Sequence, residues 1–331
     1  MADTEASPDG LEKATIGPRP PLIVVVMPAY RSASKIGSVL AAVPSRVHRI
    51  VVVDDASPDD LTRAVAAVAD ARIVVLRHPV NRGVGAATRA GFAAAIELGA
   101  DIVVKVDSDG QMDPARIADL VGPILAGDAD FTKGNRFYDL RFVRAMPLAR
   151  RLGNLGLSFL VKAASGYWSV FDPCNGFLAL RVSHLRKLRV EMLADRYFFE
   201  ISLLCEAYAV GAVLHDVAMT PIYNDEVSSL SPAKSLVEFL PRLVARLARR
   251  IGYTYFLRDF TLVSVFLCAG LPLFLFGVFW SAGHWYRSYA THVVASSGTV
   301  IIGALTIILG FQLLLQALVL DVQSEPRRRT R

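Results

Sequence analysis

Two aspartates separated by one residue, Asp107 and Asp109, stand in the run Asp107-Ser-Asp-Gly-Gln111. Two carboxylates in one pocket repel each other unless they share a proton or a cation. Mg²⁺ and Mn²⁺ prefer oxygen ligands and usually keep coordination sites open for substrate phosphates. We therefore predict that Asp107, Asp109 and Gln111 hold a Mg²⁺ or Mn²⁺ ion that grips a diphosphate. A solvated acidic turn is the alternative interpretation of the same triplet.

A second acidic pair, Asp54-Asp55, closes an earlier apolar run. Its carboxylates could accept hydrogen bonds from the base and the ribose hydroxyls of a nucleoside. Asp55, with Ser57 and Asp59, is also well suited to a helix cap and turn, and the two roles are compatible. The run Asn81-Arg-Gly-Val-Gly85 precedes a predicted helix and is similar to a phosphate-cradling loop, although it matches neither the dinucleotide-binding nor the P-loop pattern.

The elements that would position these residues alternate along the chain. Short apolar runs predict fully buried strands at residues 22–27, 49–54, 72–76 and 101–107, and alanine-rich stretches predict helices at 34–43, 59–69, 84–98 and 114–126. This alternation is typical of an α/β domain with a mostly parallel sheet. Ligands bind such sheets at the carboxyl ends of the strands, where both acidic pairs fall. Further strands are expected at 129–133, 177–181 and 212–219.

The C-terminal part of the chain predicts membrane insertion. Two charge-free apolar runs, Phe260–Trp280 and Gly298–Leu320, are each long enough as a helix to cross a hydrocarbon core of about 30 Å. The mean hydropathy of +0.41 is also high for a soluble enzyme. We predict a two-helix transmembrane hairpin, and a pair of buried core helices is the alternative.

Cationic residues flank the hairpin on both sides: Lys234, Arg242, Arg246, Arg249, Arg250 and Arg258 precede it, and Arg327, Arg328, Arg329 and Arg331 follow it. The positive-inside rule then predicts an integral protein of the cytoplasmic membrane, with the catalytic domain and both termini in the cytoplasm. The loop between the spans is expected to carry the aromatic residues Trp285, Tyr286 and Tyr289 at the far interface.

The net charge of +6 could indicate nucleic acid, but the excess lies beside the membrane spans, so attraction to anionic lipid is the simpler account. Between the two regions, the residues Leu236, Leu240, Leu243, Leu247 and Ile251 fall on one helical face, a pattern typical of a helix lying in a membrane surface. We divide the chain into a disordered leader (1–21), a catalytic domain (22–230), an amphipathic juxtamembrane helix (231–259), the hairpin (260–320) and a basic tail (321–331).

Four motifs in this order resemble the nucleotide-sugar domain of family 2 glycosyltransferases, which is GT-A-like: Val26-Met-Pro-Ala-Tyr30, Val53-Asp-Asp-Ala-Ser57, Asn81-Arg-Gly-Val-Gly85 and Asp107-Ser-Asp-Gly-Gln111. More narrowly, the chain is similar to polyprenyl- or dolichyl-phosphate sugar synthases over residues 22 to about 225. Gly134-Asn-Arg136 and Asp172-Pro-Cys-Asn-Gly-Phe177 extend the resemblance.

The resemblance implies roles for individual residues. Pro28, Ala29, Tyr30 and the Asp54-Asp55 pair would surround the nucleoside, Asp107, Asp109 and Gln111 would coordinate the metal, and Arg136 would meet a phosphate. In the acceptor segment the family pairs an arginine with a serine, whereas this chain has Arg150-Arg-Leu-Gly-Asn154. Arg150 and Arg151 are therefore either acceptor-phosphate contacts or a basic membrane-facing patch. The family's late Arg-x-x-Gly-x-Ser-Lys pattern is replaced by Tyr223-Asn-Asp-Glu-Val-Ser-Ser229.

We expect an inverting transfer of a hexose from a UDP- or GDP-sugar to a membrane polyprenyl phosphate, with a homo-oligomer possible. A lipid phosphate is already anionic near neutral pH and needs no strong base, whereas a hydroxyl acceptor does, and Glu200 is then the candidate base unless it only supports the site. Two other functions stay open, namely transfer to a hydroxyl of a lipid-linked glycan, or a processive polysaccharide synthase. A membrane scaffold with a degenerate nucleotide-binding domain is the non-enzymatic alternative.

Overall fold

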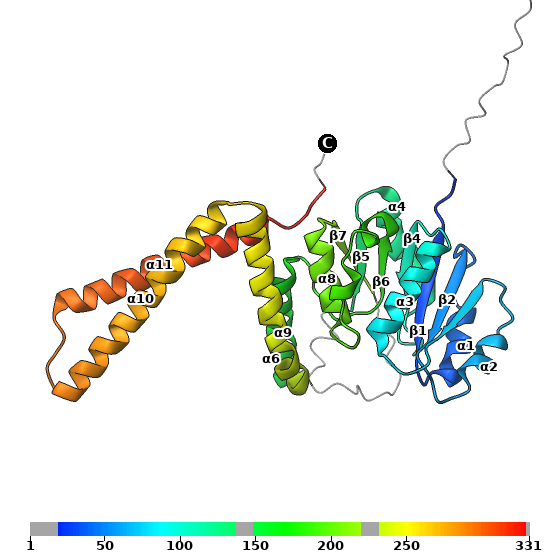
Figure 1. Cartoon of the computed structure of the whole chain (residues 1–331), viewed down its shortest axis with the longest axis horizontal. Helices are drawn as coiled ribbons and strands as arrows, with labels where there is room; N and C mark the ends of the chain where they lie inside the picture. The colour runs from blue at the N-terminus through cyan, green and yellow to red at the C-terminus, as the bar shows by residue number, and fades with distance from the viewer. Residues whose placement is uncertain (1–18, 137–147, 220–231, 329–331) are drawn as a thin grey trace, which may run out of the picture.

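The structure is a computed structural model that describes residues 19–136, 148–219 and 232–328; within these ranges the side chains of 148–152, 154 and 232–237 are left out of the description (Figure 1). Seven strands form one sheet in the order β3-β2-β1-β4-β6-β5-β7. They are β1 (Ile23–Ala29), β2 (Arg49–Asp54), β3 (Ile73–Arg77), β4 (Ile102–Lys105), β5 (Phe131–Asn135), β6 (Leu178–Arg181) and β7 (Leu214–Ala218).

The sheet is mostly parallel, as the sequence predicted. β1 pairs in parallel with β2 and β4, and β2 with β3, while β6 runs antiparallel between β4 and β5. The prediction that β3 is fully buried is wrong, because β3 is the edge strand and its residues are half-buried or exposed. An edge strand has a neighbour on one side only, so part of its surface stays in contact with solvent.

Helices cover both faces of the sheet. On one face α1 (Ala33–Ala41), α2 (Leu61–Ala66) and α4 (Ile117–Ala126, preceded by the 3₁₀ turn Pro114–Arg116) pack on Val25, Met27 and Val52. On the other face α3 (Val84–Glu97), α6 (Leu148–Ser165) and α8 (Phe199–Ala209) pack on Val26, Val51 and Leu178. Short helices α7 (Val182–Leu185) and η2 (Val190–Met192) connect β6 to α8. Alternate residues along each strand therefore enter two separate hydrophobic cores.

Helix α9 (Pro232–Gly252) runs beside α6 at the end of the sheet that carries β7 (Figure 1). Its leucine face was predicted to lie in the membrane surface, but the structure divides that face. Leu243 is buried in the hydrophobic core of the catalytic domain and Leu247 packs against it, whereas Leu240 is exposed. The apolar stripe thus serves first to dock α9 on the domain, and only part of it is free to contact lipid.

A six-residue π-helical segment, η3 (Tyr253–Arg258), leads from α9 into a long helical hairpin of α10 (Leu262–Thr291) and α11 (Ser297–Gln323) (Figure 1). Both helices are long and apolar enough to cross a membrane, and only 22% and 11% of their most apolar stretches are buried. That exposure excludes the alternative of buried core helices. Trp285, Tyr286 and Tyr289 lie in the last turns of α10 rather than in the connecting loop, which corrects the predicted loop boundaries.

The two hairpin helices approach each other at glycines. A Cβ added at Gly310 would lie 2.5 Å from the backbone nitrogen of Phe274, and one added at Gly277 would lie 2.8 Å from that of Ile307. Small residues at such crossings allow the close backbone approach that membrane helices use for packing. The hairpin is thus a packed unit, with its lipid-compatible side chains directed outward.

The end of the hairpin returns to the catalytic domain. Asp321, at the end of α11, forms a bidentate ion pair with Arg250 of α9 at 2.7 and 2.9 Å, and it accepts hydrogen bonds from Tyr255 and from Trp168 Nε1 (3.0 Å). Arg250 and Asp321 are both buried. This network holds the catalytic domain and the hairpin together at their junction.

Candidate active site at the carboxyl ends of the strands

The topology brings the two acidic pairs to one edge of the sheet. β1, β2, β4, β5 and β7 all run in the same direction, so the residues that follow them meet at the same edge. β6 runs in the opposite direction, so the turn that precedes it, residues 172–177, arrives at this edge too. The predicted convergence of polar residues at the carboxyl ends of the strands is therefore confirmed.

Asp107 lies beside a fully buried lysine. The Nζ atom of Lys105 donates to Asp107 Oδ1 at 2.6 Å and lies 3.3 Å from Oε1 of Glu200, at the start of α8. Burial alone lowers the pKa of Lys105, but the carboxylates of Asp107 and Glu200 outweigh it and hold that pKa above its ordinary value. The lysine is therefore a permanent internal cation that joins the first aspartate of the pair to Glu200.

Gly176 leaves room for this contact. A Cβ at residue 176 would lie 2.5 Å from both Asp107 Oδ2 and Lys105 Nζ. Real Cβ atoms do not approach other heavy atoms so closely, so any larger residue would displace the ion pair. The turn that contains Gly176 is therefore shaped around the Lys105–Asp107 pair.

Asp109 and Gln111 stand on the same turn as Asp107. The backbone N–H of Gln111 donates to Asp109 Oδ1 at 3.0 Å. Burial raises the pKa of Asp109, and the negative charge of Asp107 raises it further. A divalent cation shared by the two carboxylates would relieve this repulsion, and two carboxylates with a side-chain amide are oxygen donors that suit Mg²⁺ or Mn²⁺. The residues present therefore fit the predicted ion.

Asp54 and Asp55 are both buried, and protein groups already contact their carboxylates. Asp54 Oδ1 accepts from the backbone N–H of Ser57 at 2.7 Å. Asp55 accepts from the backbone N–H groups of Arg82 (3.0 Å) and Gly83 (2.7 Å). Asp55 thus shapes the loop that opens α3. The predicted cap on the next helix is not formed, because the N-cap of α2 is Asp60 and its side chain accepts no cap hydrogen bond. Each carboxylate oxygen can accept more than one hydrogen bond, so nucleoside binding by this pair stays a prediction.

The loops that follow β1 and β2 also hold backbone in an uncommon conformation. Arg31 and Ala56, which follow β1 and β2, have φ angles of 53° and 55°. Non-glycine residues adopt this left-handed region rarely, and such residues gather at functional sites. The backbone N–H of Arg31 donates to Ser57 Oγ at 2.7 Å, which ties the two loops together.

Among the residues predicted to surround the nucleoside, Pro28 and Ala29 lie in β1 with buried side chains, and Ala29 is opposite Asp54 in the register. Tyr30 follows them and is 43% exposed, with the guanidinium of Arg31 5.3 Å from its ring centroid. The tyrosine ring is therefore the one of the three side chains that is open to a ligand.

Arg136 follows β5 at the same edge and is held by Asp172. Its Nε donates to Asp172 Oδ2 at 2.7 Å and its Nη2 to Oδ1 at 3.2 Å. The aspartate is buried, whereas the arginine side chain is 40% exposed. A two-point contact of this kind orients the guanidinium, and the predicted contact of Arg136 with a phosphate stays a prediction.

The structure adds Lys105, Lys133 and Asp172 to the residues that sequence reasoning had assigned to the site. Lys105 and Lys133 both pair with Leu178 in the register, so their side chains leave the sheet on the same face, toward α8. Lys133 Nζ donates to the Asn175 carbonyl, and burial lowers its pKa. For Lys105, a lysine inside the otherwise apolar run 102–106 was the signal available in the sequence.

Several predicted features lie outside the described part of the chain. They are residues 1–18 of the leader, the segment 223–229, and Arg329 and Arg331 of the basic tail. Arg150 and Arg151 lie in the first turn of α6, but their side chains are outside the description, so their predicted contact with an acceptor phosphate stays a prediction.

The chain is similar to known glycosyltransferases in sequence. The family model described as Glycosyl transferase family 2 matches residues 24–189. The chain is 32% identical over 191 residues to a UDP-N-acetylglucosamine–dolichyl-phosphate N-acetylglucosaminyltransferase of Methanococcus voltae, covering 53% of this chain and 76% of the relative. It is 31% identical over 224 residues to a polyprenol monophosphomannose synthase of Mycolicibacterium smegmatis, covering 64% and 81%.

The fold also resembles a solved enzyme structure. Glucosyl-3-phosphoglycerate synthase of Mycobacterium tuberculosis, in complex with Mn²⁺, UDP-glucose and phosphoglyceric acid, aligns with a TM-score of 0.53 and 25% identity over 70% of this chain and 80% of that one. The GT-A-like catalytic domain is therefore confirmed.

Proposed function

The chain belongs to glycosyl transferase family 2, and on that premise we propose that it moves a hexose from a nucleotide-sugar donor to the phosphate of a membrane polyprenyl lipid. The observation that carries the acceptor assignment is the buried Arg250–Asp321 pair, which fixes the catalytic domain to a hairpin of membrane-spanning length. A water-soluble acceptor gives no reason for such an anchor, whereas a long-chain lipid phosphate keeps its reactive group at the membrane surface. The two relatives named for dolichyl-phosphate and polyprenol substrates support the same class.

Donor binding is assigned to the edge of the sheet around β1, β2 and β4. Tyr30 offers an exposed ring for the base, and the Asp54-Asp55 pair follows from the neighbouring strand, where Asp54 is opposite Ala29. We place a UDP-sugar first among donors because the Methanococcus relative is named for one and the solved Mycobacterium enzyme holds another. A GDP-sugar is the second choice, since a guanine site uses similar carboxylate contacts.

The diphosphate is assigned to the acidic turn after β4. A Mg²⁺ or Mn²⁺ ion on Asp107, Asp109 and Gln111 would supply neutralising charge for the departing nucleoside diphosphate. Arg136, oriented by Asp172, supplies a fixed positive charge from the end of β5. Fixed charges placed in this way stabilise developing negative charge without reorganisation.

The chemistry is written as an inverting displacement. A phosphate oxygen of the lipid forms a bond to the anomeric carbon while the bond from that carbon to the nucleoside diphosphate breaks. The phosphate is anionic near neutral pH, so no group must remove a proton from it. Glu200, ion-paired to Lys105, then acts as a positioning residue rather than as a base. With a hydroxyl acceptor, Glu200 would have to take the proton instead.

We further infer that the catalytic domain and both termini face the cytoplasm. The cationic residues that flank the hairpin support this orientation, because lysines and arginines next to membrane spans accumulate on the cytoplasmic side. Nucleotide sugars are made in the cytoplasm, so the proposed donor would be available on that side.

Purified full-length protein incubated with radiolabelled nucleotide sugars and polyprenyl phosphate tests the proposal. Label that enters the lipid phase only when Mn²⁺ or Mg²⁺ is present supports it. Label confined to water-soluble products would exclude a lipid acceptor, and no transfer with any donor would favour the scaffold alternative.

A further inference from the structure

Two acidic residues at the end of the hairpin hold the start of one segment of the catalytic domain. Beyond α11 the chain runs back along that domain (Figure 1). Asp321 Oδ2 accepts from Trp168 Nε1 at 3.0 Å. Glu325 Oε2 accepts from the backbone N–H of the next residue, Ser169, at 3.1 Å, and its Oε1 accepts from the hydroxyl of the same serine. Both carboxylates are buried, so these contacts are shielded from water.

The segment that begins at Ser169 leads directly to the aspartate that orients Arg136. Two residues separate Ser169 from Asp172, and a step of three residues spans at most about 10 Å. One of the two, Val170, is buried in the hydrophobic core, so the segment follows a fixed path. The Asp172 carboxylate then accepts from Nε (2.7 Å), Nη2 (3.2 Å) and the backbone N–H (3.3 Å) of Arg136. A displacement of Ser169 would therefore be passed on to the Arg136–Asp172 pair.

A third carboxylate joins the two residues next to this pair. Asp216 Oδ2, in β7, accepts from the backbone N–H of Phe171 at 2.8 Å and from Asn135 Nδ2 at 3.2 Å. Phe171 precedes Asp172, and Asn135 precedes Arg136 at the end of β5. The segment 169–172 is consequently bound to the hairpin end at its start and to the strand that carries Arg136 at its end.

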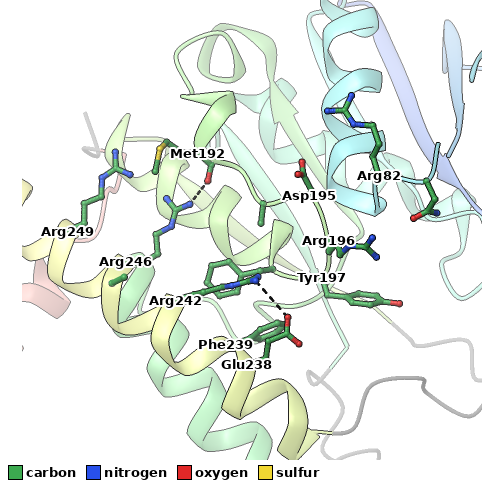
Figure 2. Close-up of a pocket in the computed structure, with 14 residues that line it drawn as sticks. Arg82, Met192, Asp195, Arg196, Tyr197, Glu238, Phe239, Arg242, Arg246 and Arg249 are labelled. Atoms are coloured by element: carbon green, nitrogen blue, oxygen red, sulfur yellow. Dashed lines mark hydrogen bonds and ion pairs between the residues drawn. The ribbon is translucent and has the colours of Figure 1, made fainter. Parts of the chain in front are cut away.

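Another contact between the membrane part and the catalytic domain bypasses this segment. Arg246 of α9 donates through Nη1 to Glu206 Oε1 of α8 at 2.7 Å, and through Nη2 to the Met192 carbonyl (Figure 2). Glu206 also accepts from Arg189 Nε at 2.9 Å, so it keeps one cationic partner if Arg246 is replaced. Loss of the Arg246 contacts would therefore loosen α9 without breaking any bond of the segment 169–172.

We propose that Glu325 is a positioning residue for Arg136. By holding Ser169, Glu325 fixes the segment 169–172, which ends in the carboxylate that orients the arginine. This inference rests on the proposed function, in which Arg136 neutralises charge on the departing nucleoside diphosphate. Because Glu325 follows the second membrane-spanning helix, the docking of the hairpin on the domain sets the geometry of the sugar-transfer site. A displacement of about 1 Å in such a charged group can slow a reaction about a hundredfold.

Transfer kinetics of full-length protein in nanodiscs test the proposal, with the nucleotide sugar that wild type transfers to polyprenyl phosphate. The variants are Glu325→Ala, Arg136→Gln and the two combined. Glu325→Gln keeps one oxygen that can accept from Ser169, and Ser169→Ala removes only the hydroxyl contact, so these two milder variants remain informative if Glu325→Ala does not fold. Arg327→Gln, at an exposed position of the same segment, is the matched control, and Arg246→Gln reports the effect of loosened docking alone.

The kcat of Glu325→Ala should fall about tenfold with a smaller change in the KM for the nucleotide sugar, because Arg136 acts mainly on charge that develops during transfer. Glu325→Gln should recover part of this loss. In the Arg136→Gln background, Glu325→Ala should cause no further loss, since both changes remove the same contribution. Arg246→Gln should lower the melting temperature while its kcat, like that of Arg327→Gln, stays at the wild-type value.

Three results would overturn the positioning role. They are an unchanged kcat in folded Glu325→Ala, or in both milder variants if that protein does not fold; a further loss of kcat when Glu325→Ala is added to Arg136→Gln; and an equal loss of kcat in Arg246→Gln. The last result would show that general loosening of the docked hairpin, rather than the bond to Ser169, reduces transfer.

Amide hydrogen exchange separates this inference from the proposed function, because it requires no transfer. The backbone N–H of Arg136 donates to Asp172, so it should exchange several-fold faster in Glu325→Ala than in wild type or Arg327→Gln. If wild type transfers no sugar and this exchange still rises, the proposed function is wrong and the link from Glu325 to Arg136 stands. If wild type transfers sugar and the exchange is unchanged, the function stands and the positioning role is wrong.

Discussion

The ammonium group of Lys105 lies 2.6 Å from Asp107 Oδ1, in a place where the lysine side chain has no contact with solvent. One carboxylate of the predicted metal site is thus already paired with an internal cation, which also reaches Glu200. The acidic turn and the start of α8 are consequently one electrostatic unit, although they are far apart in the sequence.

Replacement of Lys105 tests the electrostatic coupling between the acidic turn and the start of α8. Lys105→Met leaves two carboxylates facing each other without a counter-ion, and we expect the free energy of unfolding to fall by about 3–5 kcal/mol. Adding Glu200→Gln should recover part of the loss, because one of the two charges is then removed. Urea denaturation of the two single variants and the double variant gives the coupling energy. Lys187→Met, at an exposed position, is the control. Purely additive effects would show that the two residues act independently.

Gly176→Ala should disrupt the site by steric overlap alone. The new methyl group would lie 2.5 Å from both Asp107 Oδ2 and Lys105 Nζ, so the pair must move. We expect loss of most transfer activity and of the rise in melting temperature that Mn²⁺ causes. Gly122→Ala is the matched control, since a Cβ there has no atom within 4 Å and alanine is favoured in a helix. Equal behaviour of the two variants would contradict the described packing around Gly176.

The stability of the protein should depend on pH through Asp216. Burial raises the pKa of Asp216 to about 6, and among the described groups its Oδ1 has no hydrogen-bond partner. The folded state therefore holds this proton more tightly than the unfolded chain does. The resulting stabilisation is complete below about pH 4 and is lost as the pH rises through about 6, by up to about 3 kcal/mol.

Asp216→Asn should remove that dependence. An asparagine oxygen can still accept from Phe171 N and Asn135 Nδ2, and no charge remains to be buried. Unfolding free energies at pH 5 and pH 7.5 should then differ less in the variant than in wild type or in the exposed control Asp128→Asn. An undiminished difference in Asp216→Asn would assign the pH dependence to other groups.

The junction between the domain and the hairpin depends on Asp321. Asp321→Ala leaves Arg250 buried without its partner, at a cost of about 3–5 kcal/mol. We expect a lower melting temperature in detergent and faster proteolysis between α9 and α10. Asp259→Ala, an exposed aspartate close to the junction in the sequence, should change neither. If Asp321→Ala melts like wild type, the Arg250–Asp321 pair does not hold the two parts together.

The secondary-structure elements that depend on local sequence patterns were predicted from the sequence. Strands β1, β2 and β4 and the acidic residues after them follow from apolar runs that end in polar turns. Helix α6 was missed although Leu148, Leu152 and Leu155 follow helical spacing, because basic residues and the glycines Gly153 and Gly156 interrupt its first half. The extent of α10 was misjudged because Trp285, Tyr286 and Tyr289 suggested an interface loop, yet they include no helix-breaking residue.

Contacts between residues that are far apart in the sequence could not be predicted from local sequence patterns. Nothing near Lys105 in the sequence indicates that it meets Glu200, and nothing near Asp321 indicates Arg250. The two environments of the α9 leucine face could not be predicted either. Leu243 faces a hydrophobic core and Leu240 does not, and this difference depends on packing against residues elsewhere in the chain. The positions of the acidic residues at this edge were thus predicted from the sequence, whereas the charges that contact them were not.

The most direct measurement compares the transfer of label from a nucleotide sugar to polyprenyl phosphate by wild type, Asp109→Asn and Asp128→Asn, with and without Mn²⁺. Wild type and Asp128→Asn should form a metal-dependent lipid product that releases its sugar in mild acid, as a glycosyl phosphate does. Asp109→Asn should form at least a hundredfold less, in line with the loss of a major electrostatic contribution. A lipid product made equally by Asp109→Asn, or one stable to mild acid, would contradict the account.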